Sequence, residues 1–414
     1  MPCVKKWEIK MTYKEAVNYL NETAGFAKKN KLEHIKYLME CLGNPQREIR
    51  FVHVAGTNGK GSVCAFLEAF LLEKGWTTGV FSSPHLVSVN ERIRLNGQDV
   101  SDELFAKACS RVKDAVEEDL KKGGTHPSFF EFLFLMALII FQEIKPDCCI
   151  IETGMGGRYD ATNLLDPEIS VITSISMDHM EFLGNTLKEI AFHKAGIIKP
   201  GKQVLSCGQE EEVMQVIRDE AGKKQALLEV VSEDNLNFNE KPGKYIDFLN
   251  SNAYDRKRVA GDFQKENISL AIRAAQLLSG SLSDEKIVNG LRHLVLPGRM
   301  EEVLPRVFVD VAHNMQGIEA FCRTAERQFA GMKKRILFAA SHKNEEDYMR
   351  ARLRNLSKTE WFCQIGIEGR RIDQQEFMSA FEQLIKDRDE DTVCFIVGSF
   401  YLAGITKKCK IRRK

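Results

Sequence analysis

FVHVAGTNGKGS, residues 51–62, is the stretch that decides the fold class. Its first five residues are mostly apolar, which is typical of a short buried strand. Residues 56–62 are rich in glycine, which lets a backbone turn tightly and bring N–H groups up to phosphate oxygens. Apolar residues then recur at helical spacing until Gly75, a natural helix stop. These apolar positions are Val63, Phe66, Leu67, Phe70 and Leu71.

This strand, loop and helix, followed by a strand at residues 79–83, predict a βαβ unit with a phosphate-binding loop at its first turn. Lys60 supplies a mobile positive charge, and the following helix adds its positive N-terminal end. The loop is not the strict G-x-x-x-x-G-K-[ST] pattern, because Gly61 separates Lys60 from Ser62. A glycine turn with a surface lysine is the alternative, but the strand–loop–helix context favours phosphate binding.

Length and composition set limits on the remaining possibilities. The 414 residues suffice for two or three domains, and a net charge of +1 excludes a global field that attracts nucleic acid or anionic membranes. The 11 cysteines include no Cys-x-x-Cys pair, which indicates free thiols in a reducing compartment. Residues 1–11 have no apolar core of a signal peptide, and the longest apolar run, residues 129–141, is too short to span a bilayer. We therefore expect a cytoplasmic protein.

Strand-like and helix-like segments alternate along the chain, which predicts an α/β fold with mainly parallel sheets. Residues 1–296 are expected to form a P-loop-containing N-terminal domain, and residues 297–414 a smaller Rossmann-like C-terminal domain. The further strands are expected at residues 148–151, 169–175, 307–310, 335–340 and 392–397, and a long helix at 262–278.

Polar side chains follow two of these strands. Glu152 ends the strand at 148–151, where open α/β sheets bind ligands and where a carboxylate can hold Mg²⁺ beside a nucleotide. The alternative is a solvated acid at a strand end, but the glycine- and charge-rich loop after it favours a site. His179, beside Asp178 after the next strand, could bind a metal, although a lone histidine is more often structural.

Lys194 lies on a predicted helix that starts near Thr186, in register with Leu187, Ile190 and Ala191, so it should face inward. Its stem could simply snorkel near the helix C-terminus, which the spacing alone favours. A buried lysine with a lowered pKa and a chemical role is the sharper alternative. Downstream polar residues could contact a nucleotide or act as caps. They are Gln264, Asn267, Arg299, Asp310, His313 and Asn314.

Taken together, the motifs resemble those of the folylpolyglutamate synthase/dihydrofolate synthase family within the Mur-ligase superfamily. They occur in order over nearly the whole chain, so the combination is far more specific than any one motif. The stretches are HVAGTNGKGS (53–62), SSPHL (82–86), NERI (90–93), ETGMGGRYDATN (152–163), DH (178–179), AFHKAGIIKP (191–200), PGRM (297–300), DVAHN (310–314) and GSFYL (398–402).

The resemblance implies an ATP-dependent amide ligase that adds L-glutamate to dihydropteroate, to folate polyglutamates or to both, through an acyl phosphate, in folate biosynthesis and one-carbon metabolism. It implies ATP contacts by Thr57, Asn58, Gly59, Lys60, Gly61, Ser62, Asn267, Arg299 and Asp310. It implies two Mg²⁺ ions near Ser83, Glu152 and His179, with K⁺ as a further ion. Lys194, carbamylated by CO₂, joins Lys60 and His313 in catalysis, and the pteroate contacts are Ser128, Phe129, Tyr159, Asp160 and Ala161. The expected partners are small molecules, with no nucleic acid or membrane, and the expected state is a monomer.

Three positions depart from the family's usual pattern: Ser128 replaces threonine, Val311 replaces glycine and Met315 replaces proline. Two other functions stay open at this point. A Mur-type ligase acting on a cell-wall precursor shares the chemistry. A nucleotide-binding switch protein shares the loop, but Glu152, His179 and Lys194 argue against it.

Overall fold

The computed structural model describes residues 10–24, 29–232, 243–250, 261, 263–294, 296–340, 345–358, 361–368 and 371–409. The chain divides into two compact units. The first unit comprises Met1–Ser83, Val89–Ser232 and Leu270–Gly290, and the second comprises Pro84–Ser88, Glu233–Ser269 and Leu291–Lys414. The expected domain boundary between residues 296 and 297 stays a prediction.

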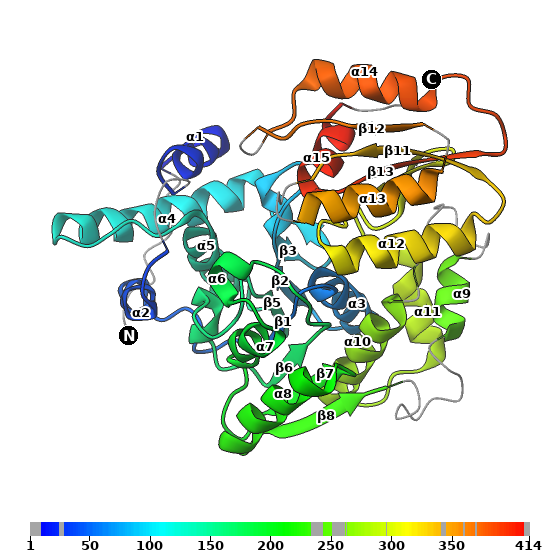
Figure 1. Cartoon of the computed structure of the whole chain (residues 1–414). Helices are drawn as coiled ribbons and strands as arrows, with labels where there is room; N and C mark the ends of the chain where they lie inside the picture. Colours follow the sequence, from blue (N-terminus) through cyan, green and yellow to red (C-terminus); the bar gives the residue numbers. More distant parts are fainter. Residues whose placement is uncertain are drawn as a thin grey trace. The chain divides into compact units, whose positions relative to one another are not determined.

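The first unit is built on an eight-stranded sheet in the order β4-β3-β2-β5-β1-β6-β7-β8 (Figure 1). Its strands are β1 (Phe51–Ala55), β2 (Thr78–Phe81), β3 (Ile93–Leu95), β4 (Gln98–Asp99), β5 (Cys148–Glu152), β6 (Ile169–Ile172), β7 (Gln203–Cys207) and β8 (Leu227–Val231). The six strands from β2 to β8 in this order are parallel, whereas β3 and β4 form an antiparallel edge.

The strands predicted at residues 51–55 and 148–151 are confirmed, but β6 ends at Ile172 rather than residue 175. The chain leaves the sheet there because the next residues bond to the loop after β1. Thr173 still donates its N–H to Ala55 O, and Ser174 O then accepts the Thr57 N–H at 2.8 Å. The strand is therefore shorter than predicted because of a hydrogen bond between distant segments, which the sequence pattern does not show.

Helices cover both faces of the first sheet. Those of this unit are α1 (Tyr13–Tyr19), α2 (Leu32–Cys41), α3 (Lys60–Glu73), α4 (Asp102–Lys121), α5 (Phe129–Ile144), α6 (Met180–Leu183), α7 (Leu187–Ala195), α8 (Glu211–Lys223) and α11 (Asp284–His293, of which residues 284–290 belong here). Short η helices are η1 (Leu20–Ala24), η2 (Val89–Arg92) and η3 (Ala161–Leu164). α10 (Gln264–Ser279) starts in the second unit and ends in the first.

α4 and α5 pack in one core with Phe81, Cys149 and Ile151, while α3 packs against β1, β2 and β5. The prediction of one apolar face on α3 was too narrow. The helix is buried on most of its surface, including Glu68, because α11 also approaches it at Gly290. Arg94 neutralises Glu68 through an ion pair of 2.7 Å.

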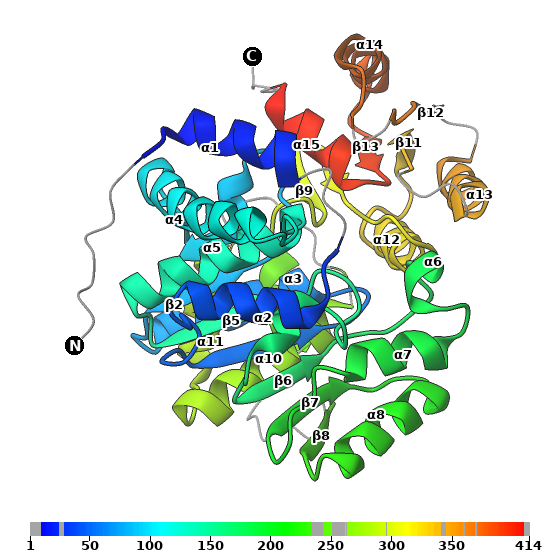
Figure 2. The same ribbon diagram turned by 90° about the vertical axis from the view of Figure 1, so that its left-hand side faces the viewer.

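The second unit carries a five-stranded sheet in the order β12-β11-β13-β10-β9, parallel except for β9. Its strands are β9 (Glu301–Leu304), β10 (Val307–Asp310), β11 (Lys333–Phe338), β12 (Phe362–Gln364) and β13 (Thr392–Val397). Its helices include α9 (Gly243–Asn250), α12 (Met315–Gln328), α13 (Glu346–Ser357), α14 (Gln374–Ile385) and α15 (Phe400–Lys408). α14 and α15 cover one face and α12 and α13 the other (Figure 2), so the expected Rossmann-like arrangement is confirmed. Within the described residues, no helix is both long enough and apolar enough to cross a bilayer.

Candidate active site

Four loops gather at one edge of the first sheet. They follow β2, β5, β1 and β6, which are neighbours in that order and run parallel. The carboxyl ends of parallel strands lie at the same edge, which is where open α/β sheets bind ligands. This topology brings Ser83, Glu152, the loop of residues 56–62 and His179 to one edge of the sheet.

The loop of residues 56–62 has a fixed backbone shape. Gly56 has a φ of +153°, and a Cβ there would lie 1.8 Å from Thr173 Oγ1, so a side chain does not fit. The loop after β6 braces it, since Thr57 Oγ1 donates to Ser176 O at 3.0 Å. α3 begins at Lys60, and the N–H groups of a first helical turn have no carbonyl partner within the helix. The loop therefore has the shape and the positive end of an anion site.

Two lysines meet at one carbonyl of this loop. Lys60 Nζ donates to Gly56 O and to Thr57 O, each at 3.0 Å, and Lys194 Nζ donates to Gly56 O at 2.8 Å. Lys194 is only 3% exposed, as its inward spacing predicts. Burial, followed by the charge of Lys60, lowers the pKa of Lys194 to about 7, against the opposing charge of Asp178. At neutral pH a large share of Lys194 is therefore a neutral amine.

The end of β5 places a buried carboxylate beside the loop. Glu152 is 4% exposed, and its Oε2 accepts the Ser83 N–H at 3.1 Å. A Cβ on Gly61 would lie 3.7 Å from the same oxygen, so the start of α3 passes close to this carboxylate. A buried acid that faces a phosphate-type loop is chemically suited to a cation that accompanies a phosphate.

His179 lies at the N-cap of α6 with a φ of +49°. Its N–H donates to Asp178 Oδ1 at 2.9 Å, and its Nε2 lies 3.8 Å from Asp178 Oδ2. Asp178 is buried, whereas the histidine ring is about one-third exposed. The part of the chain that the structure describes holds no group of three or more His, Cys, Asp or Glu side chains poised for a metal ion.

Asp160 organises the loop after β5 from within. Its Oδ2 accepts the N–H groups of Gly154 and Met155, and its Oδ1 accepts the N–H and hydroxyl of Thr162 at 3.0 and 2.6 Å. Burial raises the pKa of Asp160, and these hydrogen bonds act against the rise. Because the Thr162 hydroxyl gives its proton to Asp160, His53 must donate to it from Nε2 at 2.8 Å. Burial lowers the pKa of His53 to about 3, in accord with a neutral ring.

The other residues expected at the pteroate differ in exposure. Tyr159 is 56% exposed, while Ala161 is buried. Ser128 caps α5 through a capping box with Glu131, so serine performs the cap that the family's threonine would provide. The Arg92 guanidinium lies 5.2 Å from the centre of the Phe129 ring. Tyr159 and Phe129 therefore offer ring surfaces, and Asp160 and Ser128 shape the backbone.

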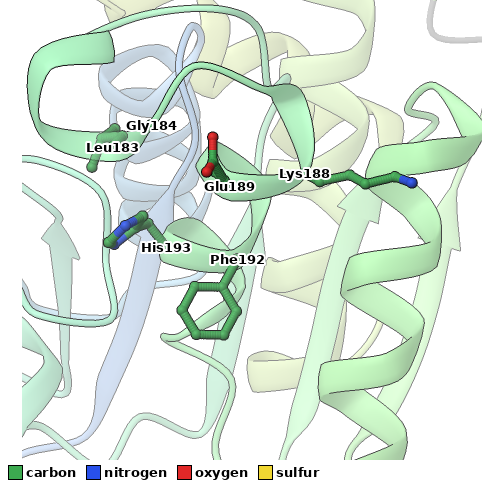
Figure 3. Close-up of a pocket in the computed structure, with 6 residues that line it drawn as sticks. All are labelled: Leu183, Gly184, Lys188, Glu189, Phe192 and His193. Carbon is green, nitrogen blue, oxygen red and sulfur yellow. The ribbon is translucent and has the colours of Figure 1, made fainter.

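A shallow pocket of about 300 Å³ lies along α6 and α7, and the sequence did not single out its residues. Leu183, Gly184, Lys188, Glu189, Phe192 and His193 line it. In Figure 3 the side chains of Leu183 and His193 lie on one side, and Lys188 extends away from them. The Tyr159 ring packs edge-on against His193 at 5.5 Å, so the pocket adjoins the loop after β5. Burial, followed by the nearby charge of Arg158, lowers the pKa of His193.

The second unit brings three of the expected residues together. Asp310, at the end of β10, accepts the N–H groups of Met300 and Ala312 at 2.9 and 2.8 Å. Burial raises the pKa of Asp310, while the charge of Arg299 lowers it. The Arg299 guanidinium and the His313 ring lie 5.5 and 5.3 Å from the ring of Phe400, which the sequence did not single out as a site residue.

Some other positions of this unit that the sequence singled out are buried. Asn267 is buried on α10 and donates to Gln264 Oε1 at 2.8 Å. Val311, where the family usually has glycine, is buried in the core of this unit.

The Mur ligase middle domain matches residues 54–275. The dihydrofolate synthase/folylpolyglutamate synthase of Bacillus subtilis (strain 168) is 34% identical over 426 residues, covering 96% of this chain and 99% of that protein. The chain belongs to this family. A solved FPGS–AMPPCP–folate complex has a TM-score of 0.81 at 27% identity, covering 97% of this chain and all of that one. The bifunctional folylpolyglutamate synthase/dihydrofolate synthase from Yersinia pestis c092, complexed with AMPPNP and Mn ion, has a TM-score of 0.76 at 25% identity over 98% of this chain and 99% of that one.

The family resemblance and the α/β fold with two mainly parallel sheets are thus confirmed. The expected function is confirmed as well: an ATP-dependent ligase of the folylpolyglutamate synthase/dihydrofolate synthase kind that adds glutamate to folates. The roles of individual residues remain predictions. Their positions can nevertheless be compared with the chemistry that this class of enzyme requires.

Proposed function

We propose that this family member uses ATP to join the amine of L-glutamate to the carboxylate of dihydropteroate, of a folate polyglutamate or of both. The observation that carries the proposal is the meeting of Lys60 and Lys194 on Gly56 O, beside the buried carboxylate of Glu152. This arrangement combines a phosphate-type loop, a buried carboxylate and an amine of lowered pKa at one sheet edge. The relatives bound to AMPPCP and folate, and to AMPPNP and Mn, support the same assignment.

The chemistry explains the need for ATP. A carboxylate does not condense with an amine at neutral pH, because oxide is a poor leaving group. An oxygen of the acceptor carboxylate attacks the γ-phosphorus, the bond to the β-phosphate oxygen breaks, and ADP leaves. The neutral glutamate amine then attacks the acyl carbon, and phosphate departs with the electron pair while the amine loses a proton. The loop N–H groups and Lys60 position the phosphates and offset their charge.

Mg²⁺ fits the residues that this edge presents. It prefers oxygen ligands, keeps several waters and commonly binds through one or two carboxylates together with substrate phosphates. Glu152 supplies such a carboxylate and Ser83 a hydroxyl oxygen, whereas the nitrogen of His179, a ligand type that Mg²⁺ does not prefer, is proposed from the family resemblance alone. When bound, the ion would neutralise charge on the ATP phosphates. A second Mg²⁺ and a K⁺ ion stay predictions from the family resemblance.

Carbamylation of Lys194 fits its burial. CO₂ reacts with a neutral amine, which then loses a proton and becomes an anionic carbamate. The lowered pKa of Lys194 supplies the neutral amine at physiological pH. The carbamate would supply a carboxylate next to the phosphate loop. We expect Lys194→Ala to lose activity and short carboxylic acids to restore part of it, whereas near-normal activity without rescue would contradict the role.

The remaining roles follow from exposure and packing. We assign acceptor contacts to Tyr159 and Phe129, through their rings, with Ser128, Asp160 and Ala161 shaping the adjoining backbone. In the second unit, we assign nucleotide contacts to Asn267, Arg299 and Asp310, and a catalytic role to His313. The proposed cytoplasmic location is in keeping with ten free cysteines among the described residues, and the monomeric state stays a prediction.

Phosphate release from Mg·ATP and glutamate, measured with dihydropteroate and tetrahydrofolate supplied separately, tests the proposal. Release with dihydropteroate alone indicates a dihydrofolate synthase, with tetrahydrofolate alone a polyglutamate synthase, and with both a bifunctional enzyme. Each of these outcomes requires that omission of glutamate abolish release. Release with neither acceptor would contradict the proposed substrate class.

A further inference from the structure

The loop after β5 is fastened to the end of α7 by backbone and side-chain hydrogen bonds of its own residues. Arg158 donates its N–H to His193 O at 2.7 Å and its Nε to Phe192 O at 3.2 Å. Asn163 Nδ2 donates to Gly196 O at 3.3 Å and, within the loop, to Arg158 O at 2.9 Å. Every acceptor is a backbone carbonyl, so these bonds fix the backbone of the loop after β5 and of the end of α7.

A further bond and close packing complete this connection. Lys199 Nζ donates to Asn163 O at 2.6 Å. A Cβ on Gly157 would lie 2.9 Å from His193 O and 3.0 Å from the carbonyl oxygen of Lys194 itself. A Cβ on Gly196 would lie 2.5 Å from Arg158 Cα. The two segments therefore pack backbone to backbone, and the hydrogen bonds of Arg158 and Asn163 hold them in register.

The Arg158 guanidinium makes further contacts. It pairs with Glu220 on α8 at 2.9 Å and lies 3.8 Å from the centre of the Phe192 ring. Lys224 pairs with the other carboxylate oxygen of Glu220 at 2.8 Å. The connection is thus anchored to α8 as well as to α7.

The two fastened segments have different proposed tasks. The loop carries Tyr159, a proposed acceptor contact, and α7 carries Lys194, the proposed carbamylation site. We propose that Arg158 and Asn163 are positioning residues that couple acceptor binding to CO₂ uptake by Lys194. The coupling favours both events, because acceptor contact with Tyr159 and carbamylation of Lys194 use the same arrangement of the two fastened segments. This inference rests on the proposed function, and thermodynamic linkage requires the effect to be reciprocal.

The test measures the carbamate directly, without turnover. The enzyme is equilibrated with ¹³C-bicarbonate, Mg²⁺ and AMPPCP, and the Lys194 carbamate is followed by ¹³C NMR with and without folate. Lys194→Met identifies the signal that belongs to this residue. Asn163→Ala removes the side-chain hydrogen bonds to Gly196 O and Arg158 O. Arg158→Lys is a second variant that keeps a positive charge near Glu220 but loses the Nε hydrogen bond to Phe192 O. Arg273→Ala is the control, because it breaks the bidentate ion pair with Glu229 between α10 and β8.

For the wild type and Arg273→Ala, we expect folate to lower the bicarbonate concentration at half-saturation at least about 5-fold, the lower end of ordinary coupling between sites. For Asn163→Ala and Arg158→Lys, we expect folate to change it less than about 2-fold, because coupling below about 0.4 kcal/mol is effectively lost. A full folate effect in both variants would overturn the positioning role. A wild-type carbamate that folate does not affect would overturn the coupling alone, whereas the absence of any Lys194-dependent signal would overturn the carbamylation itself.

Discussion

Replacing Lys194 by methionine should make the folded protein more stable. The side chain is 3% exposed, and its pKa falls from 10.5 to about 7 on folding. At about 1.4 kcal/mol for each tenfold change in proton affinity, the cost of burying this lysine at pH 7 is about 4 kcal/mol. Losing the Nζ hydrogen bond to Gly56 O removes about 1 kcal/mol of stabilisation. The expected gain in the free energy of unfolding is therefore about 3 kcal/mol.

The gain should depend on pH. An unfolded lysine keeps its proton up to about pH 10, whereas folded Lys194 loses it near 7, so the unfolded state binds more protons between these values. Wild-type stability then rises with pH, and the advantage of Lys194→Met should shrink to about 1 kcal/mol at pH 9. Urea unfolding in CO₂-free buffer at several pH values measures this difference. Lys188→Met, an exposed position on the same helix, is the control. A Lys194→Met variant no more stable than the wild type at pH 7, or a gain independent of pH, would refute the reasoning.

Three further substitutions test separate parts of the site. Glu152→Gln keeps an acceptor for the Ser83 N–H but removes the negative charge. We expect kcat/KM for Mg·ATP to fall about 100-fold, with little change in the urea midpoint of unfolding. A loss of less than about 3-fold would argue against a metal-binding role. Gly56→Ala places a Cβ 1.8 Å from Thr173 Oγ1, which forces the loop out of its present shape. We expect calorimetry to show nucleotide affinity reduced about 10-fold or more. Unchanged affinity would show that the loop is not the nucleotide site. Asp160→Ala leaves its buried partners, including Thr162, without an acceptor. We expect the free energy of unfolding to drop by about 2 to 4 kcal/mol. An unchanged free energy of unfolding would show that the loop does not depend on this carboxylate.

Local patterns in the sequence sufficed for the strand, loop and helix of the proposed nucleotide site. β1, the glycine-rich loop and α3 are consecutive in the chain, and their residue types carry their own conformational reasons. The inward position of Lys194 likewise follows from helical spacing within α7. The placement of Glu152 beside the loop could be expected only in outline, since parallel strands bring their carboxyl ends to one edge.

The details that decide chemical roles depend on contacts between distant segments. Lys194 and Gly56 are 138 residues apart, and His53 and Thr162 are 109 apart, so no local pattern predicts either hydrogen bond. The expectation that Asp160 contacts the pteroate came from its place in a family motif. The structure shows that the Asp160 carboxylate accepts hydrogen bonds from four donors of its own loop. The residue type alone does not show that these acceptor positions are already filled.

Transfer of a labelled oxygen tests the central claim most directly. The acceptor is supplied with oxygen-18 in its carboxylate, together with Mg·ATP and glutamate, and the released phosphate is analysed by mass spectrometry. If the carboxylate oxygen attacks the γ-phosphorus, each phosphate released with amide formation carries one oxygen-18 atom. Phosphate without the label, formed alongside the glutamyl product, would contradict activation through an acyl phosphate and the account built on it.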